Sequence, residues 1–128
     1  MISEFIIVDG MEWRIPILSV DRQFPFLDKA AERNLDGKAD RELIGVFRNH
    51  RMQFGSVLDT GLYAAFIEML TEPLPFRTIT VPGNDTEAYT YTAYTAEIAD
   101  RLRRLKSGKA YWQGLSMDFI AREPWKRP

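Results

Sequence analysis

The sequence contains no cysteine, and His50 is the only histidine among its 128 residues. Without thiols the chain forms neither disulfides nor thiolate metal sites, and thiol catalysis is excluded. A serine–histidine–acid arrangement would have to use His50. That residue lies on an expected strand beside Arg48 and Arg51, whose charges disfavour a protonated imidazole. We therefore expect a protein that is not an enzyme, with no catalytic residue, no cofactor and no metal site.

The sequence also has no excess of positive or negative charge. The 17 lysine and arginine residues nearly balance the 18 aspartate and glutamate residues, giving a formal net charge of −1. Such a chain has no overall field to hold a nucleic-acid backbone or an anionic membrane. The longest apolar run near the start, residues 5–8, is too short for a membrane span or a signal-peptide core. We expect no membrane partner and no general binding of nucleic acid.

Alternation of apolar and polar residues is the main pattern that is present. In the run 111–121, one parity is apolar apart from Gln113, and its members are Tyr111, Leu115, Met117, Phe119 and Ala121. This alternation predicts a β-strand with one face in the core. Asp9-Gly10 favours a tight hairpin between the first two apolar runs. Pro16 places the second run at a sheet edge or at a bulge.

A third strand is expected over about residues 41–55. Residues 48–51 interrupt its apolar set, which indicates a bend, a crossing between sheets or a face in water. The period then changes to three and four residues, and one amphipathic helix over about residues 58–71 is predicted. Asp59 or Thr60 is the expected N-cap, and Glu72-Pro73 ends the helix.

Two segments are harder to interpret. Residues 21–40 lack alternation and carry nine charged residues. We expect a long exposed loop, with a brief helix over residues 26–33 as the alternative. Because structureless loops of this length are uncommon in compact domains, the loop is expected to be functional or an assembly arm, and otherwise a mobile excursion. Residues 96–105 fit a helix or a strand, and the turn at 106–109 favours a strand.

These elements predict a mainly β (α+β) fold, an antiparallel β-sandwich or open barrel of about six or seven strands with one flanking α-helix. Residues 1–124 form a single domain on this interpretation. Residues 125–128 form a C-terminal tail that begins with Trp125. An exposed tryptophan is often a docking anchor, although it more often packs on its own domain.

The charged clusters offer little chemistry. Asp36, Asp40 and Glu42 lie around a glycine but lack the spacing of a calcium loop. A basic cluster precedes Tyr111 and Trp112, and its members are Arg101, Arg103, Arg104, Lys106 and Lys109. Interleaved cations and aromatics can bind single-stranded nucleic acid, but a solvated strand face with a basic hairpin tip is the favoured explanation, since the whole chain is not basic. A third hypothesis is that it meets an acidic patch, such as the 21–42 region, on a neighbouring copy.

Several short stretches resemble the small structural proteins of siphophage and prophage tail modules of Gram-positive bacteria. They are EWRIP at 12–16, DGK at 36–38, RELIGV at 41–46, the helix at 63–70 with TEP at 71–73, YWQGL at 111–115 and FIAREP at 119–124. Together these stretches cover nearly the whole chain. His50, Arg51 and the arginine-rich segment depart from the pattern.

The resemblance implies the tail-tube fold of tube subunits and distal tail proteins, a β-sandwich with one helix and a long loop that reaches a neighbouring ring. It also implies a virion structural protein made in the bacterial cytoplasm and placed in the virion tail. Its partners would be copies of itself, in a hexameric ring, and other phage tail proteins. Nucleic acid would be met only as DNA passing through an assembled tube.

The candidate subunit interface predicted from these observations comprises Asp36, Lys38, Asp40, Arg41, Arg101, Arg103, Arg104 and Trp125. The alternative function is a monomeric binding module that uses the basic and aromatic hairpin 101–112 for nucleic acid or carbohydrate. Reversing the charges of Arg103 and Arg104 would weaken ligand binding on that hypothesis and leave assembly unchanged.

Overall fold

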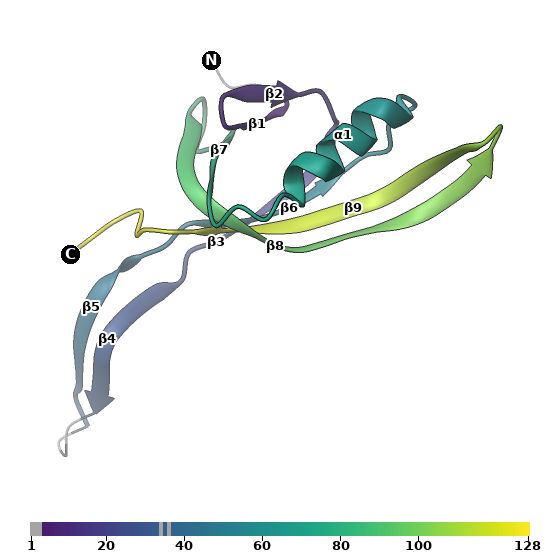
Figure 1. Ribbon diagram of the computed structural model, residues 1–128. Helices are drawn as coiled ribbons and strands as arrows, with labels where there is room; N and C mark the ends of the chain where they lie inside the picture. Colours follow the sequence, from purple (N-terminus) through teal and green to yellow (C-terminus); the bar gives the residue numbers. More distant parts are fainter. Residues whose placement is uncertain (1–3, 34, 36) are drawn as a thin grey trace.

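The computed structural model describes residues 4–33, 35 and 37–128, and it confirms a mainly β fold with one helix flanking an open sheet (Figure 1). The described strands are β1 (Ile6–Val8), β2 (Met11–Trp13), β3 (Ile17–Gln23), β4 (Phe26–Arg33), β5 (Ala39–Val46), β6 (Asn49–Phe54), β7 (Arg77–Pro82), β8 (Ala88–Lys106) and β9 (Lys109–Ala121). Helix α1 spans Thr60–Leu70.

Seven strands form one antiparallel sheet in the order β2-β1-β7-β8-β9-β6-β3. Strand β8 turns the corner of this sheet, because its first part pairs with β7 and its second part with β9. Ala93 belongs to both ladders, opposite Arg77 and opposite Ala121. The sheet therefore bends over itself without closing into a barrel, and β2 and β3 remain as its edges.

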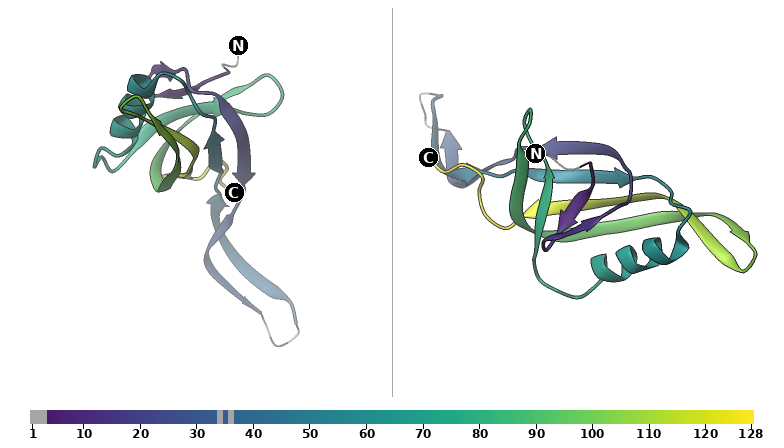
Figure 2. Two further views of the ribbon diagram at one scale, coloured as in Figure 1. Left: turned by 90° about the vertical axis from the view of Figure 1, so that its right-hand side faces the viewer. Right: turned by 90° about the horizontal axis from the view of Figure 1, so that it is seen from above.

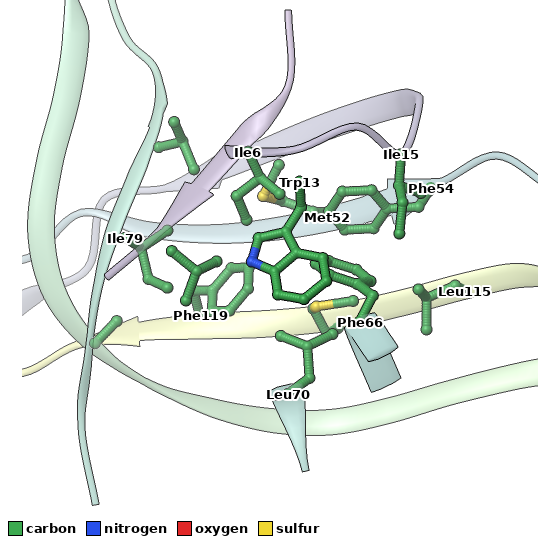
Figure 3. Packing of buried hydrophobic residues seen from close by; sticks show 14 of the residues in the cluster. Ile6, Trp13, Ile15, Met52, Phe54, Phe66, Leu70, Ile79, Leu115 and Phe119 are labelled. Atoms are coloured by element: carbon green, nitrogen blue, oxygen red, sulfur yellow. The ribbon is translucent and has the colours of Figure 1, made fainter. Parts of the chain in front are cut away.

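The core lies between the two wings of the bent sheet and α1 (Figure 3). The rings of Trp13 from β2 and Phe54 from β6 lie 5.4 and 5.3 Å from the ring of Phe66 in the helix. The predicted helix is confirmed, with Tyr63, Phe66 and Leu70 as its buried residues. The Asp59 side chain accepts from Leu62 N–H at 3.0 Å, as expected of an N-cap.

Residues 21–40 are not the long loop that we predicted, and no helix forms over residues 26–33. Strand β3 continues to Gln23, and β4 pairs with β5 from Phe26↔Val46 to Arg33↔Ala39. The strand pairing satisfies the backbone groups that a loop would leave to water. This segment is a two-stranded ribbon, the arm (residues 26–46), which extends away from the sheet (Figure 2).

The expected third strand is two strands, β5 in the arm and β6 in the sheet, so the predicted crossing between sheets is confirmed. Arg48 and His50 do not face water, since each is 1% exposed. Arg48 and His50 thus mark a bend and lie with their side chains under other parts of the chain, whereas Arg51 is exposed.

Residues 96–105 form a strand, as favoured, and belong to the long strand β8. The parity predicted for Tyr111 is wrong. A bulge at Gly114, whose φ is +68°, adds one residue to β9 between Gln113 and Ser116. The bulge reverses the faces beyond it, so Trp112 points to the side of Leu115, and Tyr111 points outward with Gln113.

Candidate functional site

The arm is the most prominent projection of the molecule. Apart from a bridge between Val46 and Lys126 at its base, β4 and β5 pair only with each other among the described residues. Phe26 and Leu27 are about half exposed, and Leu35 is fully exposed. A two-stranded ribbon is marginally stable by itself in water. Apolar side chains along such a ribbon make it a candidate contact surface.

Charges are segregated on the outer part of the arm. Glu32 lies directly opposite Asp40 in the strand register, and Glu42 is two residues from Asp40. Because side chains two residues apart share a face, these three carboxylates form one acidic face. Arg33 and Arg41 have the opposite parity, and Arg41 pairs with Asp28 across the ribbon. Within the paired strands, one side of the arm therefore presents Glu32, Asp40 and Glu42, and the other presents Arg33 and Arg41 together with Asp28.

A second ribbon projects from the other end of the molecule. It is formed by the ends of β8 and β9, here the distal hairpin (residues 99–113), and it extends past α1 on the side away from the arm (Figures 1 and 2). Leu102 faces Trp112 and Leu105 faces Ala110 on one side. The other side presents Arg101, Arg104, Lys106 and Lys109, with the Arg104 guanidinium 5.2 Å from the ring centre of Tyr111.

The distal hairpin is held at its root by α1. The Tyr63 hydroxyl donates a hydrogen bond to the Asp100 carboxylate at 2.6 Å. Burial and this carboxylate raise the pKa of Tyr63, so its proton stays on the phenol. The apolar side of the hairpin and the helix line a groove of about 550 Å³ that includes Ile67 and Trp112. The helix thus sets the direction in which the hairpin projects.

Arg48 occupies the base of the arm. Its guanidinium is buried, with its centre 4.0 Å from the ring centre of Tyr89 and 4.9 Å from that of Trp125. It donates to Glu87 Oε1 at 2.9 Å. The Phe24 ring, just before the arm, lies 5.6 Å from the Trp125 ring. One cation therefore connects both ends of the arm, the β7–β8 turn and the C-terminal segment.

The C-terminal segment lies against β5. Trp125 N–H donates to the Val46 carbonyl at 2.8 Å, and Val46 N–H donates to the Lys126 carbonyl at 2.8 Å. A side chain at Gly45 would place a Cβ 2.6 Å from that Lys126 oxygen. The close approach explains why glycine suits this position.

His50 lies beside this cluster on β6. Its Nδ1 and the Tyr91 hydroxyl share a hydrogen bond of 2.8 Å. Burial, followed by the charges of Arg48 and Arg22, lowers the pKa of His50 to about 4. The predicted influence of Arg48 is confirmed, whereas Arg51 is not among the causes. A neutral imidazole on a packed strand has the features of a structural residue.

We expect His50 to make the protein less stable in mild acid. Its folded-state pKa of about 4 lies below the ordinary 6.5, so between these values the unfolded chain binds a proton that the folded chain does not. The stabilisation is complete above pH 6.5 and is lost as pH falls towards 4. Urea titrations give the free energy of unfolding at each pH from 7 to 4.5. With falling pH, this free energy should fall less steeply for His50→Gln than for the unaltered chain, and the difference in slope should correspond to about one proton per molecule. Equal slopes in this interval would contradict the assignment, and equal slopes at pH 7 to 8 are the internal control.

The residues predicted to form a subunit interface fall in three places. Asp36 lies outside the described residues. Lys38, Asp40 and Arg41 lie exposed on the arm, and Arg101, Arg103 and Arg104 lie exposed on the distal hairpin. Trp125 is half-buried at the base of the arm. The structure therefore brings none of these groups together within one copy.

The sequence analysis placed Glu32 and Glu42 in a general acidic region without a defined face, and it missed the ion pair of Arg48 with Glu87. Both carboxylates belong to the acidic face of the arm, which was not recognised because Glu32 was assigned to a loop and Glu42 to a separate strand. Their alternation with Arg33 and Arg41 was the available signal. Arg48 and Glu87 are far apart in the sequence, and no local pattern indicated their pairing.

The chain matches no protein-family model and no curated protein sequence. Its resemblance to phage tail proteins stays a prediction. Among the described residues, no group of three or more metal-binding side chains is placed to hold a metal ion. No described segment forms a helix with the length and apolar character that crossing a membrane requires.

Proposed function

We propose that this protein is a non-enzymatic structural subunit of a phage or prophage tail, and that it assembles with copies of itself into a closed ring. The observation that carries the proposal is the arm, a ribbon with exposed apolar residues that pairs with no other strand of the described domain. Packing against a neighbouring subunit would stabilise such a ribbon.

The open edges of the sheet also support the proposal. Among the residues that the structure describes, strand β3 pairs only with β6, and its seven residues leave backbone groups available on the other side. Short β2 forms the opposite edge. An unpaired edge can receive a strand from another copy. The resemblance supports a hexameric ring in the virion tail, with other tail proteins as neighbours and DNA passing through.

Sedimentation velocity on the purified chain tests the proposal. Over a roughly hundredfold range of concentration, we expect the monomer to give way to one larger species of fixed size, because a closed ring uses up its interfaces. A protein that stays monomeric at every concentration would argue against the proposal. An unlimited series of larger species would argue against a closed ring.

A further inference from the structure

The basic side of the distal hairpin lacks anionic partners within the described chain. Arg101, Arg104, Lys106 and Lys109 lie exposed on it, and none of them forms an ion pair with a described carboxylate. Lys106 even lies directly opposite Lys109 in the register. Like charges opposite each other destabilise a pair of strands. This arrangement costs free energy in the isolated chain unless something anionic lies on it.

The acidic face of the arm carries the opposite charge. Glu32 lies directly opposite Asp40, which is again a like-charge pair across two strands. Glu32 and Glu42 are exposed and form no ion pair with a described cation. One face of the arm and one side of the distal hairpin thus carry opposite charges. Asp40 and Glu42 follow the two-residue period of a strand, about 7 Å, and the cations stay on one side of the hairpin across the irregularity between Leu102 and Arg104.

The two faces cannot meet within one molecule, because the arm and the distal hairpin point in opposite directions (Figures 1 and 2). They can meet between two copies. Two different surfaces that meet between identical subunits form a head-to-tail contact, and head-to-tail contacts generate rings when the rotation closes. Opposed charges at such a contact select the partner surface and set its register.

We propose that the acidic face of the arm of one copy docks on the basic side of the distal hairpin of the next copy. The inference rests on the proposed function, since it names the surfaces by which the chain self-assembles. It excludes nucleic acid as the main ligand of the distal hairpin.

Paired charge reversal tests the contact. One variant carries Glu32→Lys, Asp40→Lys and Glu42→Lys, and the other carries Arg101→Glu, Arg104→Glu and Lys106→Glu. Each should require at least about tenfold more protein to assemble, because like charges then face each other. The chain that carries all six changes should assemble as the unaltered chain does. An equimolar mixture of the two single-sided variants should also assemble, with the two kinds of subunit alternating.

A chain with Glu4→Lys and Glu123→Lys reverses two exposed carboxylates elsewhere and should assemble normally. Circular dichroism identifies any variant that fails to fold. Salt provides a test on the unaltered chain, since the Debye length shortens from about 10 Å at 0.1 M to about 3 Å at 1 M. Assembly should weaken across this range, and assembly that is insensitive to salt would overturn the inference.

The outcomes separate this inference from the proposed function. If the unaltered chain never assembles, the proposed function fails and takes the inference with it. If it assembles and both single-sided variants assemble equally well, the inference alone is wrong.

A labelled single-stranded oligonucleotide is added to the unaltered chain and to the hairpin variant. Binding that the hairpin changes abolish, with assembly intact, would assign the basic side to nucleic acid and overturn the contact.

Discussion

A chain in which Asn-Gly replaces residues 28–44 is expected to fold normally and to remain monomeric at concentrations where the full chain assembles. The change removes the outer arm with its charged faces, which on our account supply the main contact between copies. Because no other described strand pairs with this part of the arm, its removal takes no ladder from the seven-stranded sheet.

The site of the replacement follows from the strand register. Phe47 N–H donates to the Pro25 carbonyl at 2.9 Å, and Leu27↔Gly45 is the pair two residues further along the ribbon. In an antiparallel ribbon, hydrogen-bonded and non-hydrogen-bonded pairs alternate, so two pairs that are two residues apart are of the same kind. A two-residue Asn-Gly turn is suited to closing a ribbon there. Val46 is kept, together with its bonds to the C-terminal segment.

Sedimentation velocity and thermal unfolding, run together, check this prediction. The shortened chain should sediment as a monomer. Its Tm should lie within a few degrees of the Tm of the full chain, measured at a concentration where the full chain is also monomeric. Assembly of the shortened chain to the same size as the full chain would show that the arm is dispensable.

Arg48→Met is expected to lower the free energy of unfolding by about 2 kcal/mol or more, because desolvated cation–π contacts contribute about that much. The change removes the guanidinium from between Tyr89 and Trp125 and breaks its bond to Glu87. It should also weaken assembly, since the cluster fixes both ends of the arm. Urea unfolding measures the first effect and sedimentation the second.

Glu87→Ala should be more harmful than Arg48→Met, although it removes the more exposed partner. Without Glu87 the guanidinium stays buried with no carboxylate beside it, whereas without Arg48 the partly exposed Glu87 carboxylate can be hydrated. The same change removes the carboxylate that accepts from Asn84 N–H. A Tm for Arg48→Met below that of Glu87→Ala would contradict this argument.

Arg51→Met is the matched control for Arg48→Met. Arg51 lies on the same bend in the sequence, but it is half exposed and pairs with Asp118 at 3.4 Å. Surface ion pairs contribute about 0–1 kcal/mol. A loss equal to that of Arg48→Met would mean that burial of the cation is not the cause.

The predictable parts of the fold are those where apolar periodicity is strong. The helix followed from the spacing of Leu62, Phe66 and Leu70, and the last strand from Leu115, Met117 and Phe119. The strand at 96–105 was favoured by the turn that follows it. The bulge at Gly114 was not predictable. A bulge is an extra residue in one strand relative to its partner, and it can be recognised only when the register of the two strands is known.

The arm shows why part of the candidate site was missed. Its strands alternate acidic and basic residues, as in Glu32-Arg33 and Asp40-Arg41-Glu42, and neither face is apolar along its outer half. A search for apolar alternation therefore finds a loop there. The buried Arg48 was missed for a different reason, since the partners that stabilise it, Tyr89 and Glu87, come from a distant strand and turn.

Native mass spectrometry of the purified, unaltered chain beside the chain shortened at residues 28–44 tests the central claim most directly. The account predicts one discrete multiple of the subunit mass for the full chain, and the subunit mass alone for the shortened chain. The subunit mass alone for both, or the same multiple for both, would contradict it.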